Sequence, residues 1–142
     1  MQILLVEDNE GDVRLIKEAF NESNIEKSFS VAKDGEDALN YLYKRGKYSE
    51  CIRPDIIFLD INLPKKNGFE VLDQIKHDPE LKTIPVIMLS SSSSEDHIHK
   101  SYDLNANCYV TKPVDFDEYT EVVKTIEDFW FDKAKLPIYS KP

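Results

Sequence analysis

Several features that mark particular classes of protein are scarce or absent in this sequence. The chain has two cysteines, Cys51 and Cys108, and neither forms a C-x-x-C pair or a cluster with histidine. We therefore expect ordinary thiols rather than a zinc site or a disulfide. No apolar run approaches the roughly 20 residues that span a bilayer, and residues 3–6 follow the first methionine without a basic segment and a cleavage site. These absences predict a cytoplasmic protein without membrane insertion.

Basic residues are also outnumbered by acidic ones, 18 to 27, which gives a formal net charge of -9. The phosphate backbone of a nucleic acid repels such a charge, so we expect no direct contact with nucleic acid. A length of 142 residues supports one substantial core but not two ordinary domains. The sequence therefore predicts a single folded domain.

Short apolar runs alternate with segments of helical periodicity five times along the chain. The predicted strands cover residues 3–6, 29–31, 55–60, 86–89 and 109–112. The predicted helices begin near residues 9–12, at 34–35, after 68, at Ser92 or Ser93, and at Asp115, where Glu118 completes a capping box. Short parallel strands need helical crossovers. The pattern therefore predicts an α/β fold of the flavodoxin-like type, a doubly wound five-stranded parallel sheet of order 2-1-3-4-5 with five helices on both faces.

The remaining segments are interpreted from their turn residues. Residues 44–53 are polar and end at Pro54, so we expect a surface loop. The turn at residues 105–107 is expected to need a positive φ, which Asn tolerates. We expect one domain over residues 1–131 and a tail over residues 132–142, with no separate output domain. The tail is either a docking segment or a frayed end.

Polar side chains gather where the predicted strands end. Glu7, Asp8, Asp60, Ser90 and Lys112 all fall at the carboxyl ends of adjacent strands, where an open α/β sheet carries its ligand site. Carboxylates at such a site repel one another by roughly 4 kcal/mol per pair at about 4 Å. Lys112 supplies one positive charge, and a partly hydrated Mg2+ suits the oxygen ligands. A metal, a lysine and a carboxylate nucleophile are the parts needed for phosphoryl transfer.

These motifs, in this order, resemble the receiver domain of two-component response regulators, the CheY-like fold. The resemblance covers about residues 1–128 and rests on Glu7-Asp8, Asp60 with Pro64 and Gly68, Ser90, Tyr109 and Lys112-Pro113. It implies that Asp60 is the phosphoacceptor for a sensor histidine kinase. It also implies that Asp8, Asp60 and the backbone carbonyl of Asn62 bind Mg2+, with Glu7 acting through bound water and Mn2+ able to substitute.

The same resemblance implies a switch rather than a turnover enzyme. Lys112 would contact the phosphoryl oxygens, Ser90 would bind the new phosphate, and Tyr109 would change rotamer. The output would be a contact with an unknown downstream protein, and the chain would catalyse its own phosphorylation. Ser92, two positions after Ser90, offers no carboxylate or amide to position water. We therefore expect slow self-dephosphorylation despite Asn62.

A narrower resemblance concerns three further segments. The insertion 44–53, the stretch 101–109 and the ending 126–130 are similar to single-domain regulators that partner cyanobacterial phytochromes. This similarity implies a light-sensing histidine kinase as partner and a homodimer. Phe129, Trp130 and Phe131 are consecutive, so one helix face cannot bury them all. We favour a dimer or partner surface there; the alternative is packing under Leu136 and Ile138.

Two other functions fit this sequence less well. A metal-dependent phosphohydrolase with an aspartyl-phosphate intermediate usually has a second acid two residues after its nucleophile, where this chain has Asn62, and a cap over its substrate. A phosphorylation-independent pseudo-receiver usually loses an acid or the lysine, and this sequence keeps them. His97 and His99 lie two residues apart on a predicted helix and point to different faces, so we expect solvated side chains rather than a metal site.

Overall fold

The computed structural model of the chain describes residues 1–137. Its strands are β1 (Gln2–Val6), β2 (Ser28–Ala32), β3 (Ile56–Leu59), β4 (Val86–Ser90) and β5 (Cys108–Thr111). Its α-helices are α1 (Glu10–Asn21), α2 (Gly35–Leu42), α3 (Gly68–His77), α4 (Glu95–Asp103) and α5 (Phe116–Ile126). A 3-10 helix η1 (Gly46–Tyr48) and a π-helix η2 (Glu127–Lys133) complete the order. Within the described residues, no helix combines the length and apolar character needed to cross a membrane.

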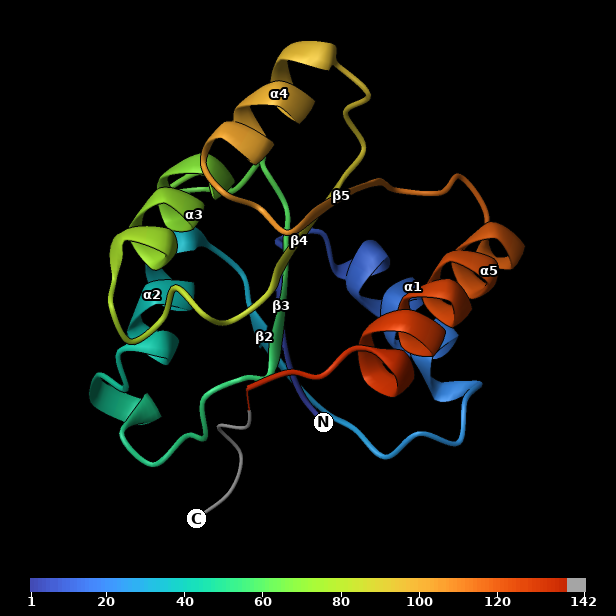
Figure 1. Cartoon of the computed structure of the whole chain (residues 1–142), viewed down its shortest axis with the longest axis horizontal. Coiled ribbons are helices and arrows are strands. Elements are labelled where there is room, and N and C mark those ends of the chain that lie inside the picture. Colours follow the sequence, from blue (N-terminus) through green and yellow to red (C-terminus); the bar gives the residue numbers. More distant parts are fainter. Residues whose placement is uncertain (138–142) are drawn as a thin grey trace.

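The five strands form one parallel sheet in the order β2-β1-β3-β4-β5, which confirms the predicted topology. Figure 1 shows α1 and α5 on one face of the sheet and α2, α3 and α4 on the other. β3 is one residue shorter at each end than predicted, so Asp55 and Asp60 flank it. The strand order reverses direction between β1 and β3, and the carboxyl ends of these strands are where such a fold carries its site.

Alternate residues of the central strands contribute to two separate apolar layers. In β1, Leu4 and Val6 join the layer beneath α2 and α3, whereas Ile3 and Leu5 join the layer beneath α1 and α5. Every residue of β3 is buried. Burial on both faces explains why the central strands are continuous apolar runs in the sequence. The site residues therefore extend from the most deeply buried strands of the molecule.

Each α-helix begins with a side-chain cap, and the caps are Asn9, Asp34, Asn67, Ser94 and Asp115. The prediction that Ser92 or Ser93 caps α4 was wrong, because Ser94 accepts the hydrogen bond from the His97 amide. Ser92 is otherwise engaged, since its hydroxyl lies 2.8 Å from the His97 ring and accepts the Ser94 amide.

The capping box predicted at the start of α5 is half formed. Asp115 accepts the amide of Glu118 at 2.9 Å, as predicted. The Glu118 carboxylate accepts the amide of Val114 at 3.4 Å instead of the amide of Asp115. The turn before β5 does adopt the predicted positive φ, with Asn105 at 71°.

α4 buries little of its own side-chain surface against the rest of the fold. Its one buried side chain is Ser101, whose hydroxyl donates to the His97 carbonyl at 2.8 Å. Its contact with α3 centres on Phe69, whose ring meets the edge of the His97 ring at 5.6 Å. The Lys100 ammonium lies 4.6 Å from the same ring. α4 therefore has no continuous apolar face against the core.

The insertion 44–53 is more ordered than the predicted surface loop. It contains η1, and the Tyr48 ring packs edge-on against Tyr41 with centroids 5.2 Å apart. The Tyr48 hydroxyl donates to Asp37 at 2.8 Å. The Tyr41 hydroxyl lies 3.0 Å from the Ser30 hydroxyl and 3.1 Å from the Ile52 carbonyl. The insertion is therefore held against α2.

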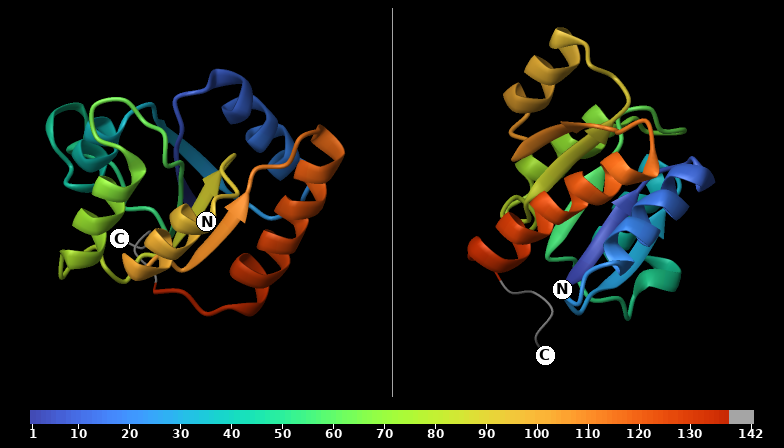
Figure 2. Two further views of the ribbon diagram at one scale, coloured as in Figure 1. Left: turned by 90° about the horizontal axis from the view of Figure 1, so that it is seen from above. Right: turned by 90° about the vertical axis from the view of Figure 1, so that its right-hand side faces the viewer.

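The last helix continues beyond α5 as η2, which is tied to the loop after α1 by buried charges. Glu127 is 2% exposed, and its carboxylate accepts the Ser23 hydroxyl and lies 3.3 Å from the Lys27 ammonium. Lys27 also donates to the Ser23 oxygen at 2.7 Å and to the Ile25 carbonyl at 2.9 Å. Figure 2 shows α1 and α5 side by side across one face of the sheet.

The three consecutive aromatic residues of η2 point in different directions. Phe131 stacks on Phe20 with ring centroids 5.9 Å apart, Trp130 packs half-buried against the same layer, and Phe129 is 55% exposed. Trp130, Phe131 and Leu136 line a cavity of about 310 Å³. Inward packing therefore accounts for Phe131, whereas Phe129 remains available for a partner. Ile138 lies outside the described residues.

Candidate functional site

The predicted site residues stand directly after the strands. Glu7 and Asp8 follow β1, Asp60 follows β3 and Lys112 follows β5. Their backbones continue the sheet: the Glu7 amide donates to Ala32 at 3.0 Å and the Lys112 amide to Ser90 at 2.7 Å. The side chains are therefore positioned by the sheet rather than by flexible loops.

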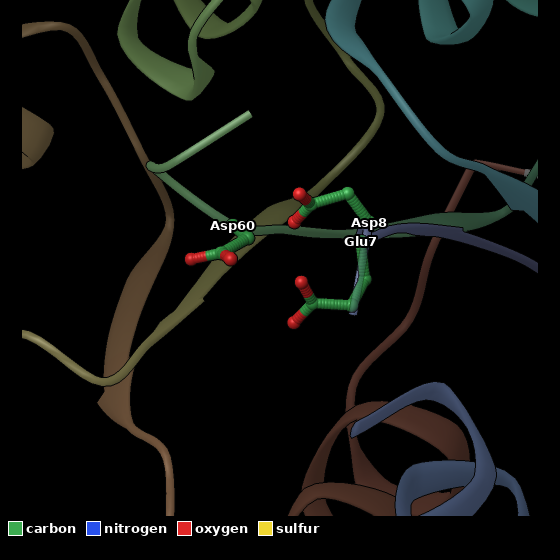
Figure 3. A group of neighbouring side chains, drawn as sticks. All are labelled: Glu7, Asp8 and Asp60. Carbon is green, nitrogen blue, oxygen red and sulfur yellow. The ribbon is translucent and has the colours of Figure 1, made fainter. Parts of the chain in front are cut away.

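Three carboxyl groups come together at these strand ends. Oxygens of Glu7, Asp8 and Asp60 all lie within 4.8 Å of one another, and Figure 3 shows the three side chains next to each other. Glu7 and Asp60 are buried, and Asp8 is exposed. Oxygen ligands of this kind suit Mg2+, which retains waters and accepts phosphate oxygens in its remaining positions. Within residues 1–137 no other group of acids, histidines or cysteines has this spacing.

The Lys112 ammonium lies among these acids. It donates to Glu7, to Asp60 at 3.3 Å and to Asp12 at 3.0 Å, and its side chain is 7% exposed. The contacts with Glu7 and Asp60 confirm the charge partner expected for the predicted acidic cluster. Asp12, in the first turn of α1, was not singled out in the sequence.

Negative charge exceeds positive charge at the site, and the pKa values reflect this. Burial, reinforced by the charge of Asp60, raises the pKa of Glu7 to about 7 despite the hydrogen bond from Lys112. Burial alone would lower the pKa of Lys112, but the hydrogen bond to Glu7 and the charges of Asp60 and Glu7 raise it above its usual value. Both shifts have one physical cause beyond burial: several carboxylates share a single ammonium.

The orientation of the Asp60 carboxylate is fixed by one hydrogen bond to each of its two oxygens. Oδ1 accepts the Ile61 amide at 2.8 Å, and Oδ2 accepts the Lys112 ammonium. Asn62 follows in an exposed part of the loop. Its carbonyl as a metal ligand stays a prediction.

Ser90 and Tyr109 both contact Ser92, the second residue after β4. The Ser90 hydroxyl accepts the Ser92 amide at 3.2 Å, and the Tyr109 hydroxyl donates to the Ser92 carbonyl at 2.7 Å. His97 bonds the Ser92 hydroxyl and packs on Phe69, so the prediction of a solvated His97 was wrong. The two predicted switch residues therefore meet at one loop position.

Most of the chain matches a known protein family. The family model of the response regulator receiver domain matches residues 3–124. The chain belongs to the response regulator receiver domain family. This agrees with the resemblance inferred from Asp60, Lys112 and their neighbours.

Individual relatives resemble this receiver domain over nearly their whole length. Response regulator Rcp1 of Synechocystis sp. is 44% identical over 95% of this chain and 92% of its own. A solved structure described as the phosphorylated cyanobacterial phytochrome response regulator RcpA has a TM-score of 0.92 and 50% identity, covering 96% of this chain and 98% of that one. The Mn2+-bound form of Rcp1 has a TM-score of 0.91 and 43% identity, covering 96% and 99%.

The raised pKa of Glu7 predicts that the binding of a divalent metal by these acids would depend on pH. Below a pKa of about 7 the carboxyl group holds a proton that a cation must displace. Affinity for Mg2+ should therefore rise with pH, by roughly tenfold from about pH 6 to about pH 8, as the ionised fraction grows. Calorimetric titration with Mg2+ at both pH values measures this. Glu7→Gln, which has no proton to lose, should show a much flatter dependence; an equal slope in both proteins would contradict the assignment.

Gly68 controls the position of Asp60 through a close backbone contact. A Cβ at residue 68 would lie 2.1 Å from the Asp60 carbonyl oxygen and 2.7 Å from the Ile61 Cα. Gly68→Ala should therefore lower the free energy of unfolding by roughly 1–3 kcal/mol, because backbone must move. Urea denaturation measures this. Gly11→Ala is the control, since its Cβ would meet only the Asn9 side chain at 3.2 Å, and it should change stability by less than about 1 kcal/mol. Equal stability of the two variants would contradict the argument.

Proposed function

We propose that this chain is a phosphorylation-controlled switch in which Asp60 accepts a phosphoryl group from a histidine kinase, with Mg2+ as cofactor. The strongest support is the position of the Lys112 ammonium. It contacts the Asp60 carboxylate and also those of Glu7 and Asp12, so three acids share one positive charge. A simple structural ion pair needs one acid, whereas this arrangement suits an added cation and a transferred phosphoryl group. The receiver unit is assigned to residues 1–131, with a tail over 132–142, acting in the cytoplasm.

In the proposed reaction an Asp60 oxygen attacks the phosphorus of a phosphohistidine. The phosphorus–nitrogen bond breaks, the nitrogen keeps the electron pair, and a phosphorus–oxygen bond forms an acyl phosphate. The Ile61 amide and Lys112 hold the Asp60 carboxylate in place for this attack. A bound Mg2+ would be held by Glu7, Asp8, Asp60 and the backbone carbonyl of Asn62, and it would neutralise charge on the phosphoryl oxygens.

The switch follows from contacts that exist only after phosphorylation. The Ser90 hydroxyl now accepts the Ser92 amide, and a phosphoryl group on Asp60 gives its proton a doubly charged acceptor. Tyr109 holds the carbonyl of the same Ser92. Movement at Ser92 is therefore expected to reach Tyr109 and α4 together, which alters the surface offered to a downstream protein.

The test of this function is intact mass after incubation with acetyl phosphate. The parent chain should gain one phosphoryl group in Mg2+ and far less in excess EDTA. No gain in Mg2+ would overturn the proposal. The Ser92 side chain has no amide or carboxylate group that could position an attacking water. Loss of the phosphoryl group should therefore be slow.

The kinase partner is proposed to belong to a phytochrome, and the likeness to the phytochrome response regulator RcpA supports this. Phosphotransfer from a purified phytochrome histidine kinase should be faster than from an unrelated histidine kinase at equal concentration. Equal rates from both kinases would remove the phytochrome assignment while leaving the switch intact.

Homodimer formation is proposed at a groove of about 470 Å³ between β5 and the end of α5, where Val110, Val122, Phe129 and Trp130 contribute apolar surface. Phe129 is 55% exposed on its rim. Phe129→Glu should weaken self-association, by at least about tenfold if the side chain is buried between copies. Sedimentation velocity measures the dissociation constant. Ile52→Glu, at a 47% exposed position in the insertion, is the matched control; identical behaviour of the two variants would move the interface elsewhere.

A further inference from the structure

Asp12 differs from the other carboxylates that hold Lys112. Glu7 and Asp60 contact Lys112 and also belong to the group of acids suited to a cation. Asp12 contacts Lys112 at 3.0 Å but is not a member of that group. A metal bound by this group would therefore share Glu7 and Asp60 with Lys112, but it would not share Asp12.

A cation on Glu7, Asp8 and Asp60 would change the surroundings of Lys112. Carboxylate oxygens that serve a dication attract an ammonium less, and the two positive charges repel each other at short range. Two of the three present partners of Lys112 are thus weakened by metal binding. The contact with Asp12 is the one that persists.

Asp12 is held in position by the first turn of α1. Its amide donates to the Asn9 side chain at 3.0 Å, which fixes the first turn of α1. A carboxylate in the first turn of a helix is favoured by the helix dipole. The Asp12 side chain is 27% exposed, so it remains partly hydrated, whereas Glu7 is almost fully buried.

We propose that Asp12 is a positioning residue that holds Lys112 beside Asp60 while the metal is bound. The proposal rests on the phosphoacceptor function given above. Without Asp12, Lys112 returns to Glu7 and Asp60 and competes with the metal for their oxygens. Asp12 thereby raises the affinity for the metal and keeps the ammonium ready for the phosphoryl oxygens.

The test is a double-mutant cycle with Asp12→Asn and Lys112→Met, read on Mg2+ affinity by calorimetric titration. In the parent background, Asp12→Asn should weaken Mg2+ binding by roughly tenfold, the effect of losing one charge-assisted hydrogen bond. In the Lys112→Met background the same substitution should have less than about a twofold effect, since no ammonium remains to compete. Equal weakening in both backgrounds would show that Asp12 acts only as a nearby charge, and no weakening in the parent would also overturn the proposal.

Glu10→Gln is the matched control, because Glu10 is an acid in the same helical turn that pairs with the exposed Lys33 rather than with Lys112. It should leave Mg2+ affinity within about twofold of the parent. A second readout is the rate of phosphoryl gain from acetyl phosphate at saturating Mg2+, which Asp12→Asn should lower severalfold. The affinity cycle needs no phosphorylation, so it remains decisive even if the parent gains no phosphoryl group and the proposed function fails.

Discussion

Asp60→Asn is expected to abolish the phosphoryl gain that the parent chain shows with acetyl phosphate and Mg2+. An amide of the same size has no carboxylate oxygen with which to form an acyl phosphate, so the loss should reach the detection limit of intact mass measurement. The substituted side chain would still fit beside the Ile61 amide, because its carbonyl oxygen can accept the hydrogen bond that Asp60 accepts now. A loss of reaction in this variant would therefore reflect chemistry rather than packing.

The fold of Asp60→Asn should be unimpaired, which makes the result interpretable. The charge of Asp60 helps to raise the pKa of Glu7, so its removal relieves repulsion. Lys112 keeps its contacts with Glu7 and Asp12. The melting temperature should be equal to or above that of the parent. Phosphoryl gain equal to the parent's would place the acceptor at a different residue.

Glu127→Ala is expected to lower the free energy of unfolding by about 3–5 kcal/mol, because it leaves a buried ammonium without its partner. The side chains of Lys27 and Glu127 are 6% and 3% exposed. Removal of Glu127 leaves Lys27 only neutral oxygens, from Ser23 and Ile25. Urea denaturation of parent and variant measures the loss.

Two further variants separate charge from packing at this position. Glu127→Gln keeps the shape of the side chain but does not neutralise Lys27. Its loss of unfolding free energy should therefore be most of the loss expected for Glu127→Ala. The double variant Lys27→Met, Glu127→Leu should regain much of this free energy, since a well-packed apolar pair often replaces a buried ion pair without loss. If Glu127→Ala loses less than about 1 kcal/mol, the pair behaves like an exposed one and the argument from burial is wrong.

The strand ends of this fold can be predicted because each is marked by residues that are adjacent in the sequence. The geometry of a parallel sheet then places these ends at one edge. A run such as residues 56–59 followed by Asp60 marks the end of a buried strand, and parallel strands bring such ends to one edge. Lys112 was placed with Glu7 and Asp60 by this reasoning alone, and the structure has these contacts. Asp12 was missed because, in sequence, an acid in a first helical turn is explained by the helix itself.

Other details depend on contacts between distant segments. Five consecutive serines offer equivalent caps by sequence, and Ser94 is selected because the fold engages Ser92 with His97 and Tyr109. Helix geometry predicts that Phe129 and Phe131 point to opposite sides, but only the contact of Phe131 with Phe20 of α1 shows which of the two packs inward. The packing of His97 also depends on a distant segment, because its partner Phe69 belongs to α3.

The small buried surface of α4 lowers the free energy that is needed to move this helix. A segment that buries one serine rather than an apolar stripe can open or shift without exposing the core, so its local stability lies well below that of the whole domain. A small difference in free energy at one end of α4 then changes the populations of its alternative positions substantially. Among the five α-helices, the one that buries the fewest side chains thus follows directly after Ser92, close to where a new charge on Asp60 would act.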